Sequence, residues 1–178
     1  AHGRVVRKIA TIALSTSTQN SSMVPMNPIV ELLPTDHALI QQIAECYNKE
    51  WDTPIEKTRH RLGTRSEGDV IFHLVACEDG QLISTGGLCN QVNLLVAHEH
   101  FKRFKPWVSM LYTSPEYRNQ NYGRKLMEDL QHRARVMGFK DIYLYSFTAV
   151  SLYEKLGWQA FAQVVYKGHE TVVMRLSL

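Results

Sequence analysis

The sequence predicts a single mixed α/β domain with a central twisted mixed sheet of about six to seven strands, flanked by helices on both faces. Three observations support this fold class. The 178 residues, 44% of them hydrophobic, suit one domain with a sizeable core. Strand-like and helix-like segments follow one another in a mixed order, without internal repeats. A long amphipathic segment, 122–137, follows closely after a strand-like run at 107–113.

Each element follows from its own local signals. Pro34-Thr35-Asp36 combines a stop with a helix cap, Thr53-Pro54 begins a helix, and Glu78-Asp79-Gly80 is a hairpin turn. In chain order we expect a strand over 29–33, a helix from Leu39 towards Trp51, a helix from Thr53 through Arg61 with Gly63 beyond its end, strands over 70–76 and 82–88, a loop over 90–105, a strand over 107–113, a helix over 122–137, a strand over 141–145, a short helix over 148–156, and a final hairpin of 160–167 and 171–176.

The segment 118–123 is the most informative part of the chain. It joins the strand at 107–113, which must finish before Pro115, to the long helix, which Gly138 ends. The apolar face of that helix is expected to contain Leu126, Met127, Leu130, Ala134 and Met137. A strand that turns through small polar residues into a helix leaves several backbone N–H groups unpaired, so we expect an anion cradle here.

This segment resembles the signature Arg/Gln-x-x-Gly-x-Gly/Ala, which follows the fourth strand in the GNAT superfamily of acyl-CoA-dependent N-acyltransferases. Arg118 and Gly123 occupy the first and last positions, and Asn121 stands where the middle glycine is expected. A glycine there takes a positive φ without a Cβ penalty, and asparagine is the next most tolerant residue. We therefore expect the loop to survive with weaker or slightly shifted contacts to the cofactor.

A second segment, 146–158, is similar to the pattern Asn-x-x-Ala-x-x-x-Tyr-x-x-x-Gly-Phe of the same superfamily. Four positions fit the pattern: Ala149, Tyr153, Gly157 and the aromatic Trp158. Ser146 replaces the usual asparagine, which puts one hydrogen bond on the pantetheine side in doubt. Two motifs in the right order make the resemblance specific, and it extends from about Ile29 to the C-terminus.

The resemblance implies an N-acetyltransferase that moves the acetyl group of acetyl-CoA to a primary amine of a small molecule, protein or peptide. The amine attacks directly in a ternary complex, and no metal takes part. A backbone amide of the fourth strand polarises the thioester, and Tyr153 protonates the leaving thiolate. The implied catalytic residues are Tyr153 and Thr113. The implied cofactor-binding residues are Leu111, Tyr112, Thr113, Arg118, Asn119, Gln120, Asn121, Tyr122, Gly123, Arg124, Ser146 and Tyr153.

The acceptor side is less defined by the sequence. The resemblance implies that the binding site for the amine acceptor is lined by Trp51, the helix near Glu56 and the 90–105 loop. The acidic residues Glu50, Asp52 and Glu56 weakly favour an acceptor that carries an amine. Candidates for a general base are His73, His98, Glu99 and His100, but deprotonation through ordered water is equally compatible, so no base is assigned. His-x-His without a third ligand favours a solvated loop over a metal site.

Charge and cysteine content limit the alternatives. Three of the 20 basic residues, Arg4, Arg7 and Lys8, precede the first acidic residue, and without them 17 basic residues balance 17 acidic ones. A neutral body disfavours a nucleic-acid-binding domain.

The cysteine content indicates the redox environment. There are three widely spaced cysteines, Cys46, Cys77 and Cys89, and this odd number favours reduced, buried thiols and a cytoplasmic location. A non-catalytic module that binds or senses acyl-CoA is the main alternative to an enzyme.

Residues 1–27 are expected to form an N-terminal extension, and residues 28–178 the domain. The extension is rich in Ser and Thr and free of acidic residues, so a vector-derived leader and an organelle-targeting segment both stay open. No apolar run approaches membrane-spanning length, so no membrane partner is expected. A homodimer is compatible with the sequence.

Overall fold

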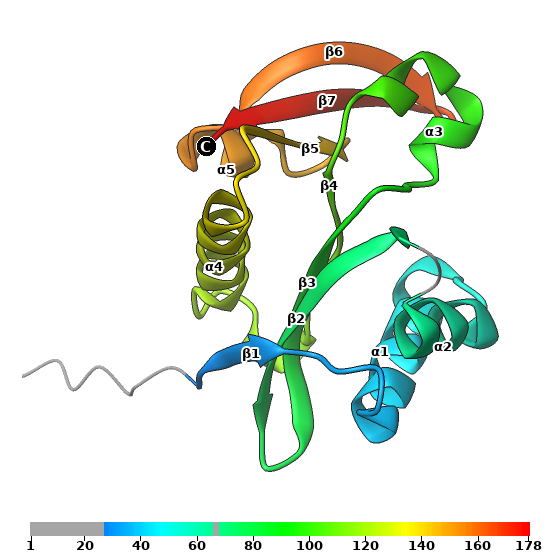
Figure 1. Cartoon of the computed structure of the whole chain (residues 1–178), viewed down its shortest axis with the longest axis vertical. Coiled ribbons are helices and arrows are strands. Elements are labelled where there is room, and N and C mark those ends of the chain that lie inside the picture. The colour runs from blue at the N-terminus through cyan, green and yellow to red at the C-terminus, as the bar shows by residue number, and fades with distance from the viewer. Residues whose placement is uncertain (1–26, 66–67) are drawn as a thin grey trace, which may run out of the picture.

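The computed structural model describes residues 27–65 and 68–178. This part of the chain contains a seven-stranded mixed sheet in the order β1-β2-β3-β4-β5-β7-β6, together with five α-helices (Figure 1). The predicted fold class is therefore confirmed. The expected extension over residues 1–27 lies, apart from Asn27, outside the described residues.

All neighbouring strands pair antiparallel except β4 and β5, which are parallel. The strands are β1 (Ile29–Glu31), β2 (Val70–Glu78), β3 (Gln81–Cys89), β4 (Trp107–Thr113), β5 (Asp141–Ser146), β6 (Gln159–Tyr166) and β7 (His169–Ser177). The helices are α1 (His37–Trp51), α2 (Ile55–Thr64), α3 (Leu94–Ala97), α4 (Tyr122–Val136) and α5 (Val150–Lys155), with 3-10 helices η2 (Glu99–Arg103) and η3 (Pro115–Tyr117).

Helices cover both faces of the sheet. Figure 1 shows α4 on one side of β2 and β3 and the pair α1 and α2 on the other. Leu126, Met127 and Leu130 of α4 are buried against β2, β3, β4 and β5. Each such side chain contributes roughly 1.5–3 kcal/mol by leaving water. Met137 was wrongly assigned to this apolar face, because it lies one residue past the end of α4 and is half exposed.

The segment 90–105 is not the loop that the sequence suggested. It contains α3 and η2, whose Leu94 and Phe101 are buried with Trp107, Tyr143 and Val173 of the neighbouring strands. The helical turns are too short to give a periodic pattern, which is why the prediction missed them. Because this segment is packed against β4, β5 and β7, its position beside the C-terminal half of the sheet is fixed.

Several predicted boundaries also shift. Gly63 lies inside α2, which ends at Thr64, and the C-cap residue Arg65 takes the left-handed conformation with φ 44°. The hairpin strands β2 and β3 are longer than expected, so the turn shrinks to Asp79 and Gly80, both at positive φ. The first strand ends at Glu31, and the N–H of Leu33 donates instead to the carboxylate of Asp36 at 2.7 Å. Asp36 precedes α1 as predicted, but its side chain makes no cap hydrogen bond.

Candidate functional site

Strands β4 and β5 separate shortly after they meet. They share one paired position, Trp107 opposite Tyr143, although β4 stays paired with β3 through Thr113 and β5 stays paired with β7 through Ser146. Beyond this position, the edges of β4 and β5 that face each other are left without a ladder. The parallel strands thus open a gap in the middle of the sheet, whose free backbone groups can bind a ligand.

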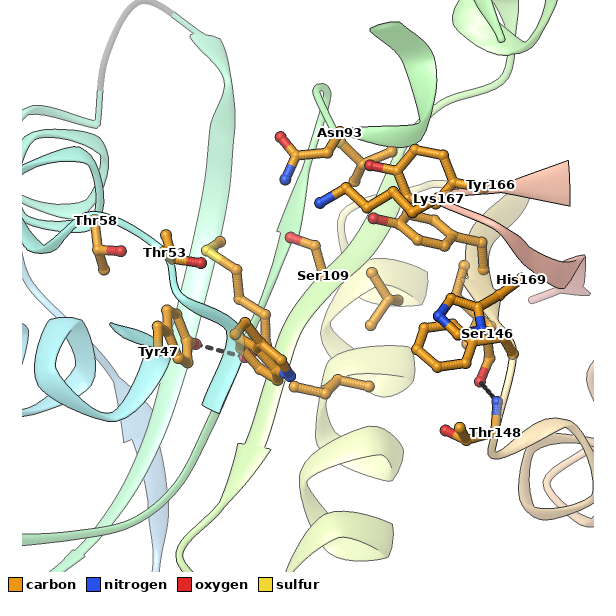
Figure 2. Close-up of a pocket in the computed structure, with 18 of the residues that line it drawn as sticks. Tyr47, Thr53, Thr58, Asn93, Ser109, Ser146, Thr148, Tyr166, Lys167 and His169 are labelled. Carbon is orange, nitrogen blue, oxygen red and sulfur yellow. Dashed lines mark hydrogen bonds between the residues drawn. The ribbon is translucent and has the colours of Figure 1, made fainter. Parts of the chain in front are cut away.

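A cavity of about 520 Å³ lies at this gap. Its floor includes Ser109, Met110 and Leu111 of β4, one wall comes from the α1–α2 region, and the opposite wall comes from β5, α5 and the β6–β7 hairpin. Figure 2 shows Tyr47, Thr53 and Thr58 along the first wall, with Ser146, Tyr166, Lys167 and His169 along the second and Ser109 between them. The cavity is large enough for a small organic molecule.

A β-bulge shapes the floor of the cavity. Thr85 pairs with Tyr112 and Gly87 pairs with Ser109, so Met110 and Leu111 together face Gly86. Met110 adopts φ 60°, an unusual conformation for a non-glycine residue. The carbonyl oxygen of Met110 accepts a hydrogen bond from the hydroxyl of Tyr47 at 2.5 Å. This hydrogen bond connects the bulge of β4 to α1.

Close packing at Gly86 supports the same bulge. A Cβ atom at this position would lie 2.5 Å from Cδ2 of Leu111 and 3.3 Å from Cδ2 of Leu126. Glycine lets Leu111 cross over β3 here, and Leu111 lines the cavity. The position of the Leu111 side chain on β4 therefore depends on the absence of a side chain at Gly86 on β3.

Tyr153 of α5 lines the cavity, and its side chain is partly buried. Burial raises the pKa of its phenol, and no charged group among the described residues opposes this shift. The ring meets Trp158 edge-on, with centroids 6.3 Å apart, which fixes its orientation. The hydroxyl forms no hydrogen bond with a described residue. The phenol is thus protonated and unpaired among the described residues, on a residue that lines the cavity. This is the state required of a general acid.

Ser146 also lines the cavity, but its hydroxyl is already engaged. Its Oγ accepts hydrogen bonds from the N–H groups of Ala149 at 3.0 Å and Thr148 at 3.4 Å. Figure 2 shows Ser146 turned towards Thr148. The side chain that replaces the expected asparagine thus shapes the turn into α5, and its own proton stays available.

Backbone N–H groups gather at the mouth of α4, which we define as residues 119–124. None of these six N–H groups donates to a backbone or side-chain acceptor within the described chain. Asn119 and Asn121 have φ 62° and 67°. Asn121 therefore adopts the left-handed conformation for which a glycine was expected. The loop conformation expected with asparagine at this position is therefore present. Free N–H groups at a helix N-terminus are suited to bind an anion.

The mouth of α4 and the cavity are separate features. Of the predicted cofactor-binding residues, Leu111, Ser146 and Tyr153 line the cavity, whereas Tyr112, Thr113 and residues 118–124 do not. Tyr112 lines a second hollow, formed with Glu50 and Pro115 on the α1 side of β4. Thr113 stands next to the mouth, since its Oγ1 would lie 3.6 Å from a Cβ placed on Gly123.

The two predicted arginines, Arg124 in the mouth of α4 and Arg118 just before it, are already paired. Nε of Arg118 donates to the carbonyl oxygen of Thr113 at 3.0 Å, and its Nη2 contacts Glu50 at 3.3 Å. Arg124 contacts Glu128, one turn along α4, at 2.9 Å. Exposed pairs of this kind are weak, so either guanidinium can be redirected to a bound phosphate at small cost.

The candidate bases do not reach the cavity. His73 is buried, and burial lowers its pKa to about 3 while its Nε2 contacts Thr85 Oγ1 at 2.7 Å. His98 contacts the carbonyl of Val165 at 3.0 Å, Glu99 pairs with Lys102, and the ring of His100 lies tilted against that of Phe101. None of the four is placed to remove a proton in the cavity. Among the described residues, no cluster of His, Cys, Asp and Glu forms a metal site.

The acceptor side agrees with the sequence analysis only in part. Trp51, the helix near Glu56 and the 90–105 segment all contribute to the cavity as expected, the helix through Lys57, Thr58 and Arg61 and the segment through Val92 and Asn93. The acidic residues Glu50, Asp52 and Glu56 do not line it. The sequence missed Tyr47, because it reads as one more member of the apolar stripe of α1. It also missed Lys167 and His169 of the β6–β7 hairpin, a region that carried no motif, and it did not single out Lys57 and Arg61 on the helix near Glu56.

Two further expectations concern the chain as a whole. The three cysteines are free thiols as predicted, but only Cys89 is fully buried, while Cys46 and Cys77 are partly exposed. Within the described ranges, no helix has the length and apolar character needed to cross a membrane.

Comparison with known protein families identifies one that matches this chain. A family model described as the Acetyltransferase (GNAT) family matches residues 37–158. A comparison with curated proteins gives no match.

Solved structures share the fold at low sequence identity. An aminoglycoside 6'-N-acetyltransferase complexed with coenzyme A has a TM-score of 0.67 at 13% identity, covering 84% of this chain and 96% of that one. A ribosomal-protein-alanine N-acetyltransferase from Brucella melitensis has a TM-score of 0.64 at 17% identity, covering 85% and 99%. An acyl-CoA N-acyltransferase from Pseudomonas aeruginosa has a TM-score of 0.60 at 22% identity, covering 83% and 97%. These likenesses concern the fold.

Proposed function

Because the chain belongs to the Acetyltransferase (GNAT) family, we propose that it transfers the acetyl group of acetyl-CoA to a primary amine of a small molecule, protein or peptide. The observation that carries this proposal is the gap between β4 and β5, together with Tyr153, which lines the cavity at that gap. A neighbouring fold that is complexed with coenzyme A supports the choice of cofactor.

The cofactor would lie across both features of the site. Its pyrophosphate would accept hydrogen bonds from the free N–H groups at the mouth of α4, where the helix dipole adds favourable potential. Arg118 and Arg124 are close enough in sequence to add charge if they leave their carboxylate partners. The pantetheine arm would follow the unpaired edge of β4 past Thr113 and Tyr112 to Leu111, which brings the thioester into the cavity.

The chemistry then needs two groups from the protein. A backbone amide at the bulge of β4, at Met110 or Leu111, would donate to the thioester oxygen and stabilise its charge as the amine attacks. When the tetrahedral intermediate collapses, Tyr153 would give its phenolic proton to the departing thiolate of CoA. No described Asp or Glu lines the cavity, and His169, which does line it, stacks on Phe147. We therefore assign no general base, and the proton of the amine would leave through ordered water.

Thr113, which the resemblance offered as a second catalytic residue, would serve the cofactor instead. It stands beside Gly123 at the mouth of α4 and does not line the cavity. We therefore assign its backbone to the pantetheine arm and place the polarising amide two to three residues earlier. A cytoplasmic location, where acetyl-CoA and reduced thiols occur together, agrees with the three free cysteines.

Release of CoA thiol from acetyl-CoA, measured across a panel of primary amines, tests the proposal. We expect amine-dependent turnover, and replacement of Tyr153 by Phe should lower kcat about 100-fold while the affinity for acetyl-CoA changes less than about threefold. Tight binding of acetyl-CoA without turnover for any amine would instead indicate a non-catalytic binding module. Equal rates for Tyr153→Phe and the native enzyme would remove Tyr153 from the mechanism.

The pH profile adds an independent readout for Tyr153. Because burial raises the pKa of its phenol above the ordinary value of 10.0, the acid stays protonated throughout the neutral range. The turnover number should therefore not fall between pH 7 and about pH 9.5. A decline in kcat with a midpoint near pH 8 would identify a different proton donor.

A further inference from the structure

Positive charge dominates the ionisable groups of the cavity. Lys57 and Arg61 of α2 line it from one side, and Lys167 from the β6–β7 turn lines it from the other. None of the described lining residues is Asp or Glu. A bound ammonium ion would therefore meet charges of its own sign, which is unfavourable in a partly enclosed space.

Arg61 is held in a fixed orientation. Its Nε donates to Asp69 Oδ2 at 2.8 Å, and its Nη2 donates to the carbonyl of Gln91 at 2.7 Å and to Asp69 Oδ1 at 3.3 Å. Its Nη1 contacts only the sulfur of Met110, at 3.6 Å, among the described residues. Thioether sulfur is a weak acceptor, so the Nη1 protons are available beside the bulge of β4.

The two lysines supply net charge. Asp69 offsets the charge of Arg61, but neither Lys57 nor Lys167 forms an ion pair with a described residue. Figure 2 shows Lys167 extending from its turn towards Asn93, over the cavity. Lys167 has φ 50°, and its Nζ lies 5.6 Å from the ring centre of Tyr166, so the side chain rests against that ring.

The acidic residues near α1 and α2 are directed elsewhere. Glu50 contacts Arg118 at 3.3 Å, and Glu56 contacts Arg59 at 2.8 Å. Asp52 ends α1 in the left-handed conformation and does not line the cavity. The acidic attraction for an amine that the sequence suggested is therefore absent from the described walls of the cavity.

On the premise of the proposed function, we infer that the acceptor is a small amine that also carries an anionic oxygen group, such as a carboxylate. Arg61 Nη1 and one or both lysines would donate charge-assisted hydrogen bonds to that group, close to the bulge that polarises the thioester. The same cations would lower the pKa of the acceptor's ammonium group and so favour the neutral amine, which is the nucleophile. One cluster of charges would thus both select the acceptor and activate it.

A series of straight-chain amino acids with one to five methylene groups between amine and carboxylate tests this inference. Each acid is compared with its primary amide, which has nearly the same size but no charge. With saturating acetyl-CoA, kcat/KM for thiol release should be about 10- to 100-fold higher for the acid than for the amide at the best chain length. The chain length with the largest ratio reports the distance from the reacting carbon to the cationic group.

Substitution of each exposed lysine in turn shows which of them binds the anionic group of the acceptor. Lys57→Gln and Lys167→Gln should each reduce the acid-to-amide ratio about fivefold or more, mainly through KM for the acid, with KM for acetyl-CoA unchanged. Lys140→Gln is the matched control, because Lys140 is an exposed lysine outside the cavity. A larger effect on acetyl-CoA than on the acid would show that these lysines bind the cofactor, and would overturn the inference.

Calorimetric binding of the acids and amides to the CoA complex distinguishes this inference from the proposed function. Tighter binding of an acid that depends on Lys57 and Lys167, without any turnover, would support the inference and refute the enzyme. Turnover of acids and amides with equal efficiency would leave the enzyme in place and overturn the inference.

Discussion

The hydroxyl of Tyr47, on α1, donates a hydrogen bond of 2.5 Å to the carbonyl oxygen of Met110, in the bulge of β4. Tyr47 is fully buried, and burial raises the pKa of its phenol, so the hydroxyl stays a donor at any physiological pH. Its ring also lies 4.8 Å from that of Trp51, a wall of the cavity. One side chain thus connects α1 to the backbone segment that we assign to polarising the thioester.

Replacing Tyr47 by Phe should disturb the bulge without removing the ring. The Met110 carbonyl loses its partner in a partly buried place, which costs about 1–2 kcal/mol in the free energy of unfolding. Because the amide next to that carbonyl is displaced, kcat should fall about tenfold while KM for acetyl-CoA changes less than about threefold. Urea unfolding and steady-state kinetics measure the two effects.

Tyr117→Phe is the matched control for that experiment. Its hydroxyl contacts Glu78 at 3.0 Å near the surface, so its loss should change the free energy of unfolding by less than about 0.5 kcal/mol. If Tyr47→Phe lost stability but kept the native kcat, Tyr47 would be a core residue only and the bulge would not depend on it.

Gly86→Ala should act on the cofactor through Leu111. The new Cβ would lie 2.5 Å from Cδ2 of Leu111, the end of a flexible side chain that can rotate into the cavity. We expect a loss of about 1 kcal/mol in stability and a rise of about fivefold in KM for acetyl-CoA. Gly87→Ala should destabilise more, because its Cβ would meet Nδ1 of buried His73 at 2.4 Å and the carbonyl of Phe72 at 3.0 Å. The reverse order of stability would contradict the packing described at the bulge.

Asn121 offers a test of the backbone at the mouth of α4. Its φ of 67° suits glycine and asparagine, whereas alanine pays a steric penalty of about 1–2 kcal/mol there. The stability order should be Gly or Asn first and Ala last, as measured by thermal unfolding. Calorimetry should show that Asn121→Gly binds CoA at least as tightly as the native protein and that Asn121→Ala binds it more weakly. Equal affinities for all three would mean that CoA does not contact this loop.

His73 should make the fold sensitive to acid. Its pKa is about 3 in the folded protein, chiefly because of burial, and about 6.5 in the unfolded chain. A lowered folded pKa means that the stability is complete above pH 6.5 and is lost as the pH falls towards 3. Linkage gives a loss of about 2 kcal/mol between pH 7 and pH 5.

Urea unfolding at several pH values checks this expectation. The His73→Gln variant should lose about 2 kcal/mol less than the native protein over the same pH range, with the exposed His132→Gln as the control for losing a histidine. Identical pH dependence in the native protein and His73→Gln would show that His73 titrates normally.

Much of the fold was predictable because its signals are local. The bounds of β4 match the prediction, and α4 differs from it by one residue, since Pro115, Gly138 and the apolar stripe each act within a few residues. The second motif placed Tyr153 and the family position of the fourth strand placed Leu111, and both residues line the cavity. The tolerance of asparagine for positive φ correctly predicted the conformation of Asn121.

The cationic residues that line the cavity could not be predicted as a group, because they are brought together by contacts between distant parts of the chain. Arg61 and Lys167 meet at one cavity only because β7 and β6 lie next to β5 across the sheet. No local pattern distinguishes Tyr47, whose spacing on α1 is that of an ordinary core residue, from a residue that supports the bulge. The acidic residues suggested an attraction for an amine that the cavity does not provide, since Glu50 pairs with Arg118, Glu56 pairs with Arg59, and Asp52 does not line the cavity.

The central claim is that CoA lies along the free edge of β4 with its pyrophosphate at the mouth of α4. Titration of the isotope-labelled protein with CoA, followed through backbone amide NMR shifts, tests it most directly. We expect the largest shifts at residues 119–124 and at 110–113, with smaller ones at Ser146 and Tyr153. Saturable binding that leaves the amides of residues 119–124 unshifted and moves a different surface would contradict it.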